Sequence, residues 1–202
     1  MNATPALGNL WLYFAIAYAV IWASMICADK KRGIPIEDPE LYSYFNKFQM
    51  VLVGQSPVLV LLILSVFIPV RSGSLFVTGI SILTAGVLLN LVAMCSFASS
   101  PGGLNAGGIY RFSRNPMYVG GILLITGLNV MGWSQSIISI AFLVISVAWI
   151  GIIHWSVLKE ESFLLQKYGK SYGEFMKRTP RYIPGLSING MVVFTGIIAL
   201  AA

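Results

Sequence analysis

Three short groups of polar residues in this chain have the chemistry to bind a small charged molecule. The first two are Gly108-Ile109-Tyr110-Arg111 and Arg114-Asn115-Pro116-Met117-Tyr118, and the third begins with the acidic pair Glu160-Glu161. The third group also includes two later segments of the sequence, Lys167-Tyr168-Gly169 and Pro180-Arg181-Tyr182-Ile183-Pro184. Each group adjoins a stretch hydrophobic enough to cross a bilayer, and charge at a membrane boundary commonly serves to bind a ligand. We therefore expect the three groups to form one site.

The acidic pair is suited to hold a cation. Glu160 and Glu161 are two of only seven acidic residues in the chain, and basic residues surround them. An exposed ion pair contributes little to stability, so a partly buried ammonium group explains the pair better than a surface contact does. The alternative is that the two glutamates only end a helix or pair with Lys159.

The second group is suited to hold an anion. Asn115-Pro116 favours the start of a helix, whose first turn presents unpaired backbone N–H groups that attract a carboxylate. The glycine-rich loop at residues 99–108 precedes it and would let the backbone approach a ligand closely. This loop does not match the phosphate-binding or dinucleotide patterns, which require a strand. The alternative is that the arginines and tyrosines of the first two groups are only topology anchors and interfacial aromatics.

The composition places these groups in an integral membrane protein. The chain of 202 residues is 57% hydrophobic and 10% charged, whereas soluble proteins are roughly 25% charged. Apolar stretches of about 20 residues are long enough to cross a bilayer. They predict an all-α fold, a polytopic transmembrane helical bundle of about five spans in a single domain over residues 1–202. The predicted spans are residues 10–28, 50–70, 75–98, 117–132 and 136–158.

Two further features of this bundle follow from the pattern. Residues 132–135 separate the last two spans, and so short a connection predicts a tight helical hairpin. Residues 186–202 form a hydrophobic C-terminal segment. Whether this segment is a sixth span, lies in the interface or packs on a neighbour stays open.

The basic residues predict the orientation in the membrane. If the five spans alternate, twelve basic residues fall on one side and Arg71 alone on the other, which is a strong positive-inside bias. The expected location is therefore integral to the membrane, with the three polar groups and the active site facing the cytoplasm. Basic residues beside spans favour anionic lipid head groups, so the partner is the lipid bilayer and no nucleic acid is expected. The twelve residues are Lys30, Lys31, Arg32, Lys47, Arg111, Arg114, Lys159, Lys167, Lys170, Lys177, Arg178 and Arg181.

Two short helices are expected outside the spans. Asp38-Pro39 begins an amphipathic segment, residues 38–48, that would lie on the membrane as a connector or as a lid for a lipid substrate. Ser171 and Glu174 have the spacing of a capping box and predict a helix that starts at Ser171.

His154 and Arg181 are the candidate catalytic residues. His154 is the only histidine of the chain. It is interpreted either as a packed histidine at a helix end or as a general base for an acceptor. Arg181 stands between two prolines, where it would bind an acceptor head group or anchor the chain at the membrane surface. No metal site is expected.

These motifs resemble a known family. Residues 102–184 look like the isoprenylcysteine carboxyl methyltransferase and phospholipid methyltransferase family of integral membrane enzymes, which share G-I-Y-R, R-[HN]-P-x-Y-x-G, E-E-x-x-L, [FY]-G-x-x-Y and [VT]-P-R-x-I-P in this order. The resemblance makes residues 102–184 the cofactor-binding and catalytic region, with S-adenosylmethionine as the cofactor in a cytoplasmic pocket. The expected cofactor contacts are Gly102, Gly103, Leu104, Asn105, Tyr110, Asn115, Pro116, Met117, Tyr118, Glu160 and Glu161.

The chain departs from the family pattern at two positions. Asn115 stands where histidine is common, and an amide can hydrogen-bond but cannot titrate. Ser156 stands four residues before Glu160, where the prenylcysteine enzymes have an arginine that is associated with acceptor binding. A carboxylate acceptor needs a cation in a dry pocket, so a lipid or other hydrophobic amine or thiol is favoured over a prenylcysteine.

The sequence thus predicts transfer of a methyl group from S-adenosyl-L-methionine to a hydrophobic or lipid-like acceptor at the cytoplasmic membrane face. This reaction needs in-line approach of the acceptor and exclusion of water, but no metal or covalent nucleophile. The alternatives are an NADPH-dependent membrane enzyme that resembles sterol reductases, and a non-catalytic membrane scaffold.

Overall fold

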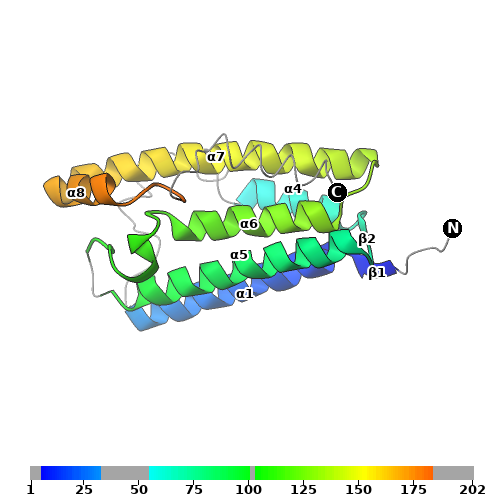
Figure 1. The fold of residues 1–202 in the computed structure, drawn as a ribbon, viewed down its shortest axis with the longest axis horizontal. Helices are drawn as coiled ribbons and strands as arrows, with labels where there is room; N and C mark the ends of the chain where they lie inside the picture. Colours follow the sequence, from blue (N-terminus) through cyan, green and yellow to red (C-terminus); the bar gives the residue numbers. More distant parts are fainter. Residues whose placement is uncertain (1–5, 33–54, 101–102, 184–202) are drawn as a thin grey trace.

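The apolar stretches form helices at the positions predicted for the spans. The computed structural model describes residues 6–32, 55–100 and 103–183. Among these residues, three helices are long and apolar enough to cross a membrane, namely α1 (Leu10–Arg32), α5 (Ser74–Ala98) and α7 (Ile137–Tyr168). Two shorter apolar helices, α4 (Gln55–Ser65) and α6 (Pro116–Met131), lie at the positions of the second and fourth predicted spans. The all-α membrane class is confirmed, and the helices lie side by side along one axis (Figure 1).

The outer surface of this bundle is apolar. Ile63 on α4, Val77 on α5 and Val144 on α7 are exposed along the outside of the helices. A soluble protein rarely exposes apolar surface of this extent, whereas hydrocarbon chains solvate it without cost. The interior is apolar as well, and Phe14, Ile125 and Phe142 belong to its main cluster of buried side chains.

Helices α5 and α6 pack with their backbones in contact. On α5, Gly79 faces Gly127 of α6, and Gly86 faces Gly120 of α6. The two glycines of each helix are seven residues apart. A Cβ atom added to Gly127 would lie 2.5 Å from the backbone nitrogen of Leu83, so no larger residue fits there. Small residues at this spacing let helices approach closely in membranes. This packing fixes the start of α6, which belongs to the site, against the end of α5.

The predicted helical hairpin is present between α6 and α7. Gly132 ends α6, and Ser136 caps α7 by accepting a hydrogen bond of 3.2 Å from the backbone N–H of Ser139. Because the connection is short, α7 runs back along α6 and carries its C-terminal half to the level at which α6 begins.

Helix α7 extends farther than the predicted span. It continues through Glu160 and Glu161 to Tyr168, where Gly169, with φ +52°, ends it. The next helix, α8 (Lys170–Arg178), therefore begins directly after Gly169, and no side chain caps it. The prediction that Ser171 caps this helix is wrong, because the left-handed glycine turns the chain two residues earlier.

A small strand pair closes the opposite end of the bundle. Strands β1 (Ala6–Asn9) and β2 (Pro69–Arg71) pair antiparallel, with Ala6 opposite Arg71. The helical pattern of the sequence did not predict them. The pair joins the start of α1 to the connection between α4 and α5, and lies far from η1 (Gly108–Arg111) and α8 (Figure 1).

Three predicted features lie outside the described residues. They are the amphipathic segment 38–48, the hydrophobic segment 186–202, and Gly102 in the glycine-rich loop.

Candidate active site

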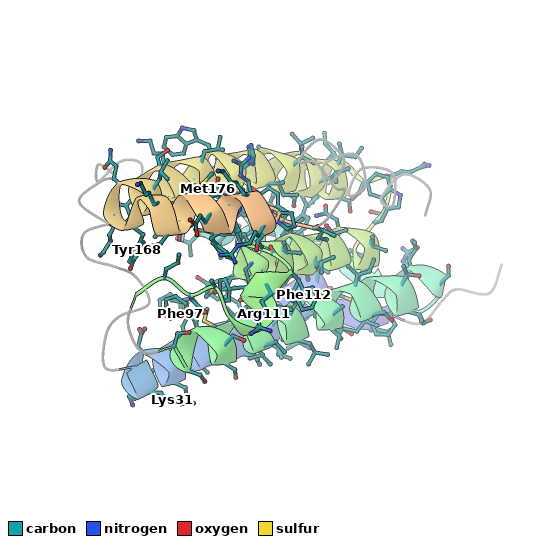
Figure 2. The ribbon with its side chains drawn as sticks, turned by 60° about the vertical axis from the view of Figure 1, so that its left-hand side comes forward. Lys31, Phe97, Arg111, Phe112, Tyr168 and Met176 are labelled. Carbon is teal, nitrogen blue, oxygen red and sulfur yellow. The ribbon has the colours of Figure 1, made fainter. Side chains whose placement is uncertain are left out.

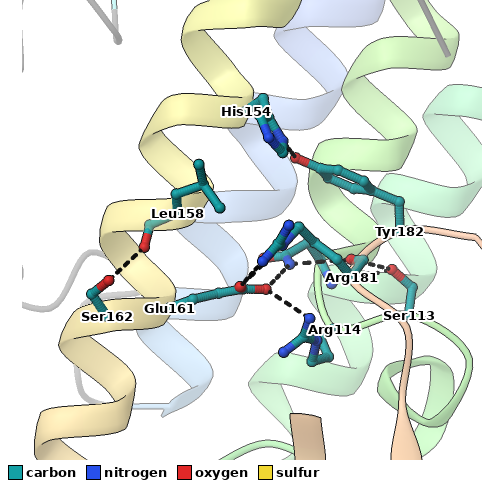
Figure 3. A network of polar contacts seen from close by, with 9 residues as sticks. Ser113, Arg114, His154, Leu158, Glu161, Ser162, Arg181 and Tyr182 are labelled. Carbon is teal, nitrogen blue, oxygen red and sulfur yellow. Dashed lines mark hydrogen bonds and ion pairs between the residues drawn. The ribbon is translucent and has the colours of Figure 1, made fainter. Parts of the chain in front are cut away.

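Glu161 is the centre of a buried network of charges. Its Oε2 accepts hydrogen bonds from Nε and Nη2 of Arg181 at 3.0 and 2.8 Å, and its Oε1 lies 3.3 Å from Nη2 of Arg114 (Figure 3). Only 4% of Glu161 is exposed. The hydrogen bonds to Glu161 raise the pKa of Arg181, so its guanidinium stays charged. Two arginines from separate segments are thus tied to one carboxylate on α7.

The segment before α6 is also bonded to the segment after α8. The backbone N–H of Arg114 donates to the carbonyl of Pro180 at 3.0 Å. The hydroxyl of Ser113 and the side-chain amide of Asn115 donate to the carbonyl of Arg181 at 3.3 and 3.1 Å. The same side-chain amide, through Nδ2 of Asn115, also donates to Oε1 of Glu161 at 3.4 Å. These bonds join two of the predicted polar groups directly.

Asn115 directs its Nδ2 into this network, and its side chain makes no capping hydrogen bond to α6. No side chain of the described residues caps the N–H groups of its first turn, which begins with Pro116. The N–H groups of Met117 and Tyr118 in that turn therefore have no side-chain cap. The predicted helix start is thus present with uncapped N–H groups, and anion binding there stays a prediction.

Glu160 points away from its neighbour and contacts a different helix. The phenol of Tyr118 donates a hydrogen bond of 2.9 Å to Oε2 of Glu160. Oε1 of Glu160 has no partner among the described residues. Glu160 thus keeps one oxygen for a further donor, whereas both oxygens of Glu161 are occupied by the protein.

An aromatic cluster adjoins the charged network. Tyr110 of η1 packs with Tyr172 and Phe175 of α8, all three buried. Half-buried apolar residues surround them, and three of these, Phe97, Tyr168 and Met176, are labelled in Figure 2. Burial and the charge of Glu161 raise the pKa of Tyr172, so its phenol remains neutral. Tyr172 therefore belongs to the aromatic cluster and also lies in the electrostatic field of Glu161. The other partly buried members are Leu104, Ile109, Met117 and Leu164.

Three buried nitrogen atoms at this end of the molecule have no hydrogen-bond partner among the described residues. They are Nδ2 of Asn105 and Nε and Nη1 of Arg114. Asn105 is held by its other atom, since Oδ1 accepts from the backbone N–H of Gly107 at 3.3 Å. An unpaired buried donor costs about 1–3 kcal/mol, so these atoms indicate a ligand that accepts hydrogen bonds.

His154 lies on the same face of α7 as Glu161, two turns closer to the hairpin. Its Nδ1 is 2.9 Å from the hydroxyl of Tyr182, which is 3% exposed. Burial raises the pKa of Tyr182 to about 12, so its phenol is neutral at physiological pH. Arg181 and Tyr182, adjacent in the chain, thus contact α7 at two points one above the other (Figure 3).

The structure brings most of the predicted site residues together. Leu104, Tyr110 and Met117 are in the aromatic cluster, while Asn115, Tyr118, Glu160, Glu161 and Arg181 are in or beside the network. Gly103 lies apart, exposed in the loop with φ +100°.

Four residues of the site, Ser113, Arg114, Tyr172 and Tyr182, were not among the predicted cofactor contacts or catalytic residues, although Arg114 and Tyr182 belong to the predicted polar groups. The motifs could have signalled them, since Ser113, Arg114 and Tyr182 adjoin assigned residues and Tyr172 ends the [FY]-G-x-x-Y motif. Within the described residues no three His, Cys, Asp or Glu side chains form a group that could hold a metal ion.

Comparison with known proteins gives a match to a family model. Residues 74–171 match the family model described as phospholipid methyltransferase. The match begins at α5, ends in the first turn of α8, and includes the glycine-rich loop, residues 114–118 and the acidic pair. No curated protein and no solved structure gives a significant match to the chain.

The apolar helical bundle and its polar end define the class of an integral membrane protein. The resemblance predicted for residues 102–184 is confirmed by a family match over residues 74–171, just under half of the chain, and residues 172–184 lie outside this match.

Proposed function

We propose that this protein transfers the methyl group of S-adenosyl-L-methionine to a hydrophobic or lipid-like acceptor at the cytoplasmic face of a membrane. The observation that carries the proposal is the pair of neighbouring glutamates with different surroundings. Glu161 is saturated by arginines, whereas Glu160 is bonded once, by Tyr118, and keeps an oxygen for a ligand. This difference supports Glu160 as the partner of the cofactor ammonium and Glu161 as the residue that positions the surrounding segments.

The unpaired buried atoms support the fit of this cofactor. Nδ2 of Asn105 is a donor for an acceptor atom of the nucleoside, and Tyr110 and Met117 supply apolar surface beside it. When bound, the cofactor supplies a methyl group on a sulfonium centre, which aromatic rings favour electrostatically. Tyr118, which is bonded to Glu160, and Tyr172, which lies in the electrostatic field of both glutamates, supply aromatic rings beside the acidic pair.

His154 and Arg181 are proposed to act on the acceptor. Tyr182 holds Nδ1 of His154, so the other ring nitrogen is oriented and has no partner among the described residues. This nitrogen would take the proton that an amine or thiol loses on methylation. Arg181 uses Nε and Nη2 for Glu161, and a third of its side chain is exposed. Its remaining nitrogen would contact the acceptor head group at the membrane surface.

The proposed orientation is supported by the arrangement of charge. The described lysines and arginines, apart from Arg71, come from the last turn of α1, η1, the segment before α6, the end of α7, and α8 with the residues behind it. These elements lie at one end of the bundle, and the strand pair with Arg71 lies at the other (Figure 1). The positive-inside rule assigns the first end to the cytoplasm.

A transfer assay with purified protein tests the proposal. The protein in lipid nanodiscs is incubated with S-adenosylmethionine carrying a labelled methyl group, and with phosphatidylethanolamine, an alkyl thiol or a farnesylcysteine analogue. Labelling of the lipid amine or the thiol is expected. Labelling of the farnesylcysteine analogue alone would contradict the acceptor assignment. In a parallel incubation with NADPH, consumption of NADPH without any methyl transfer in the first assay would contradict the reaction.

A further inference from the structure

We propose that a cleft at the end of the bundle opposite the acidic pair binds an anionic phospholipid through its phosphate group. The cleft lies where strand β2 and the start of α5 meet the α6–α7 hairpin, and we call it the hairpin cleft. These elements lie at the end of the helices away from η1 and α8 (Figure 1). The hairpin cleft shares no residue with the candidate active site, so the proposal does not rest on the proposed function.

The hairpin cleft is large and has both polar and apolar walls. Its volume is about 730 Å³, which is within the range of about 300–1,000 Å³ that small-molecule sites have. Arg71, Ser72 and Gln135 contribute polar groups to its lining, and Met131 and Ile138 contribute apolar surface. A phospholipid has the same combination, because its charged head group is joined to hydrocarbon chains.

Arg71 gives the hairpin cleft a positive charge that no described residue neutralises. Its side chain is exposed and has no ion-pair or hydrogen-bond partner among the described residues. The described acidic residues lie at the far end of the helices (Figure 1). They are Asp29 in the last turn of α1, Glu160 and Glu161 in α7, and Glu174 in α8. An anion in the cleft would supply the counter-charge that Arg71 lacks.

The hairpin cleft lies at the depth of the lipid head groups. Helix α5 has 25 residues and is therefore roughly 37 Å long at 1.5 Å per residue, whereas the hydrocarbon core of a bilayer is about 30 Å thick. Its start at Ser74, which lines the cleft, thus reaches the head-group layer. Trp133 also lines the cleft, and tryptophan is enriched at this boundary of a membrane. The anions that are abundant at this depth are the phosphate groups of lipids.

The lining favours an anionic phospholipid over a zwitterionic one or a soluble phosphate. The ammonium group of a choline or ethanolamine lipid would find no carboxylate among the described residues of the lining. The hydroxyls of Ser72 and Ser74 and the amide of Gln135 have no hydrogen-bond partner within the described part of the chain. They can bond phosphate oxygens and the hydroxyls of an uncharged head group. A soluble phosphate would leave the apolar surface of Met131 and Ile138 in contact with water.

Binding of short-chain phosphatidylglycerol tests the proposal. The full chain in uncharged detergent micelles is titrated with phosphatidylglycerol, phosphatidylcholine or sn-glycerol 3-phosphate, and the bound ligand is measured by native mass spectrometry. We expect one saturable site for phosphatidylglycerol, weaker binding of phosphatidylcholine, and no binding of sn-glycerol 3-phosphate at the same concentrations.

Two variants separate a specific site from general attraction of charge. Arg71→Gln should weaken phosphatidylglycerol binding by about fivefold, the contribution of one basic residue beside anionic lipid. Ser74→Leu keeps the charge of Arg71 but fills part of the cleft and removes a hydroxyl, so it should weaken binding as well. Arg178→Gln, an exposed arginine on α8 at the other end of the molecule, is the control and should change nothing.

Several results would overturn the proposal. Equal losses in Arg71→Gln and Arg178→Gln would show only attraction between surface charges. Equal binding of phosphatidylcholine would show that the charge of the lipid is not recognised, and equal binding of sn-glycerol 3-phosphate would make the cleft a site for a soluble anion. Unchanged phosphatidylglycerol binding in Ser74→Leu would refute the cleft as the site even if Arg71→Gln does not fold.

Discussion

The phenol of Tyr118 donates a hydrogen bond of 2.9 Å to Oε2 of Glu160 and so joins the first turn of α6 to α7. Directly beside this bond, Glu161 is tied to Arg114 and Arg181. Two consecutive glutamates on one helix therefore have different contacts and different roles. One fixes the segments that surround the site, and the other has an oxygen left for a ligand.

Loss of the Glu161 charge should destabilise the fold. In Glu161→Gln two guanidinium groups lose their buried counter-charge, and breaking such a pair costs about 3–5 kcal/mol. We expect the free energy of unfolding, measured by denaturant titration in mixed micelles, to fall by that amount. Glu174→Gln, an exposed glutamate on α8, should leave it unchanged. Equal stability of the two variants would show that the network does not hold the segments together.

The contact between α5 and α6 should be sensitive to a single methyl group. A Cβ at Gly127 would meet the backbone nitrogen of Leu83 at 2.5 Å, and overpacking of this kind costs about 1–3 kcal/mol. Gly127→Ala should therefore lower the melting temperature. Gly121→Ala, on the same helix with nothing within 4 Å of the added atom, should raise it or leave it unchanged. A stable Gly127→Ala protein would contradict the backbone contact.

The role of His154 can be separated from cofactor binding. His154→Gln should lower the rate of methyl transfer by about 10²-fold or more, as for loss of a general base, with the affinity for S-adenosylhomocysteine unchanged. Tyr182→Phe keeps the ring and removes only the hydroxyl at 2.9 Å from Nδ1. It should lower the rate by about 2- to 10-fold, the value of one hydrogen bond. Full activity of His154→Gln would contradict the role of His154 as a general base and would show that its side chain only packs in the structure.

The orientation is tested by labelling single cysteines. In a background with Cys27 and Cys95 replaced by serine, Ala106→Cys lies in the loop beside the site and Gln135→Cys in the α6–α7 hairpin, both exposed. In intact cells an impermeant maleimide should label position 135 at once, and position 106 only after lysis. Labelling of position 106 without lysis would place the site on the outer face.

The sequence predicted the helices and the convergence of the polar groups, because apolar length and motif order are local signals. It did not predict the length of α7. Apolarity ends near Leu158, but the following residues are good helix formers, and Gly169 supplies the first stop. Span prediction therefore ended at the membrane boundary, while the helix continued and presented Glu160 and Glu161 within a rigid element.

The different roles of Glu160 and Glu161 were also beyond the sequence. Consecutive residues of a helix point about 100° apart, and which one faces a neighbour depends on how α6 and the segment around Arg181 pack. The glycines at positions 79, 86, 120 and 127 carried a readable seven-residue spacing, but a spacing alone does not say which helix provides the partner. These contacts are long-range and became visible only in the folded chain.

Binding of S-adenosylhomocysteine to the purified protein tests the central claim most directly. Calorimetry should show one saturable site in the unaltered protein, no heat of binding with NADPH, and an affinity reduced by about 1.5–3 kcal/mol in Glu160→Gln, because a charged hydrogen bond to the ammonium is lost. Glu160→Gln should remain folded, since an amide can still accept the bond from Tyr118. Unchanged affinity in the folded variant would contradict the assignment of Glu160, and saturable NADPH binding in place of S-adenosylhomocysteine would contradict the account as a whole.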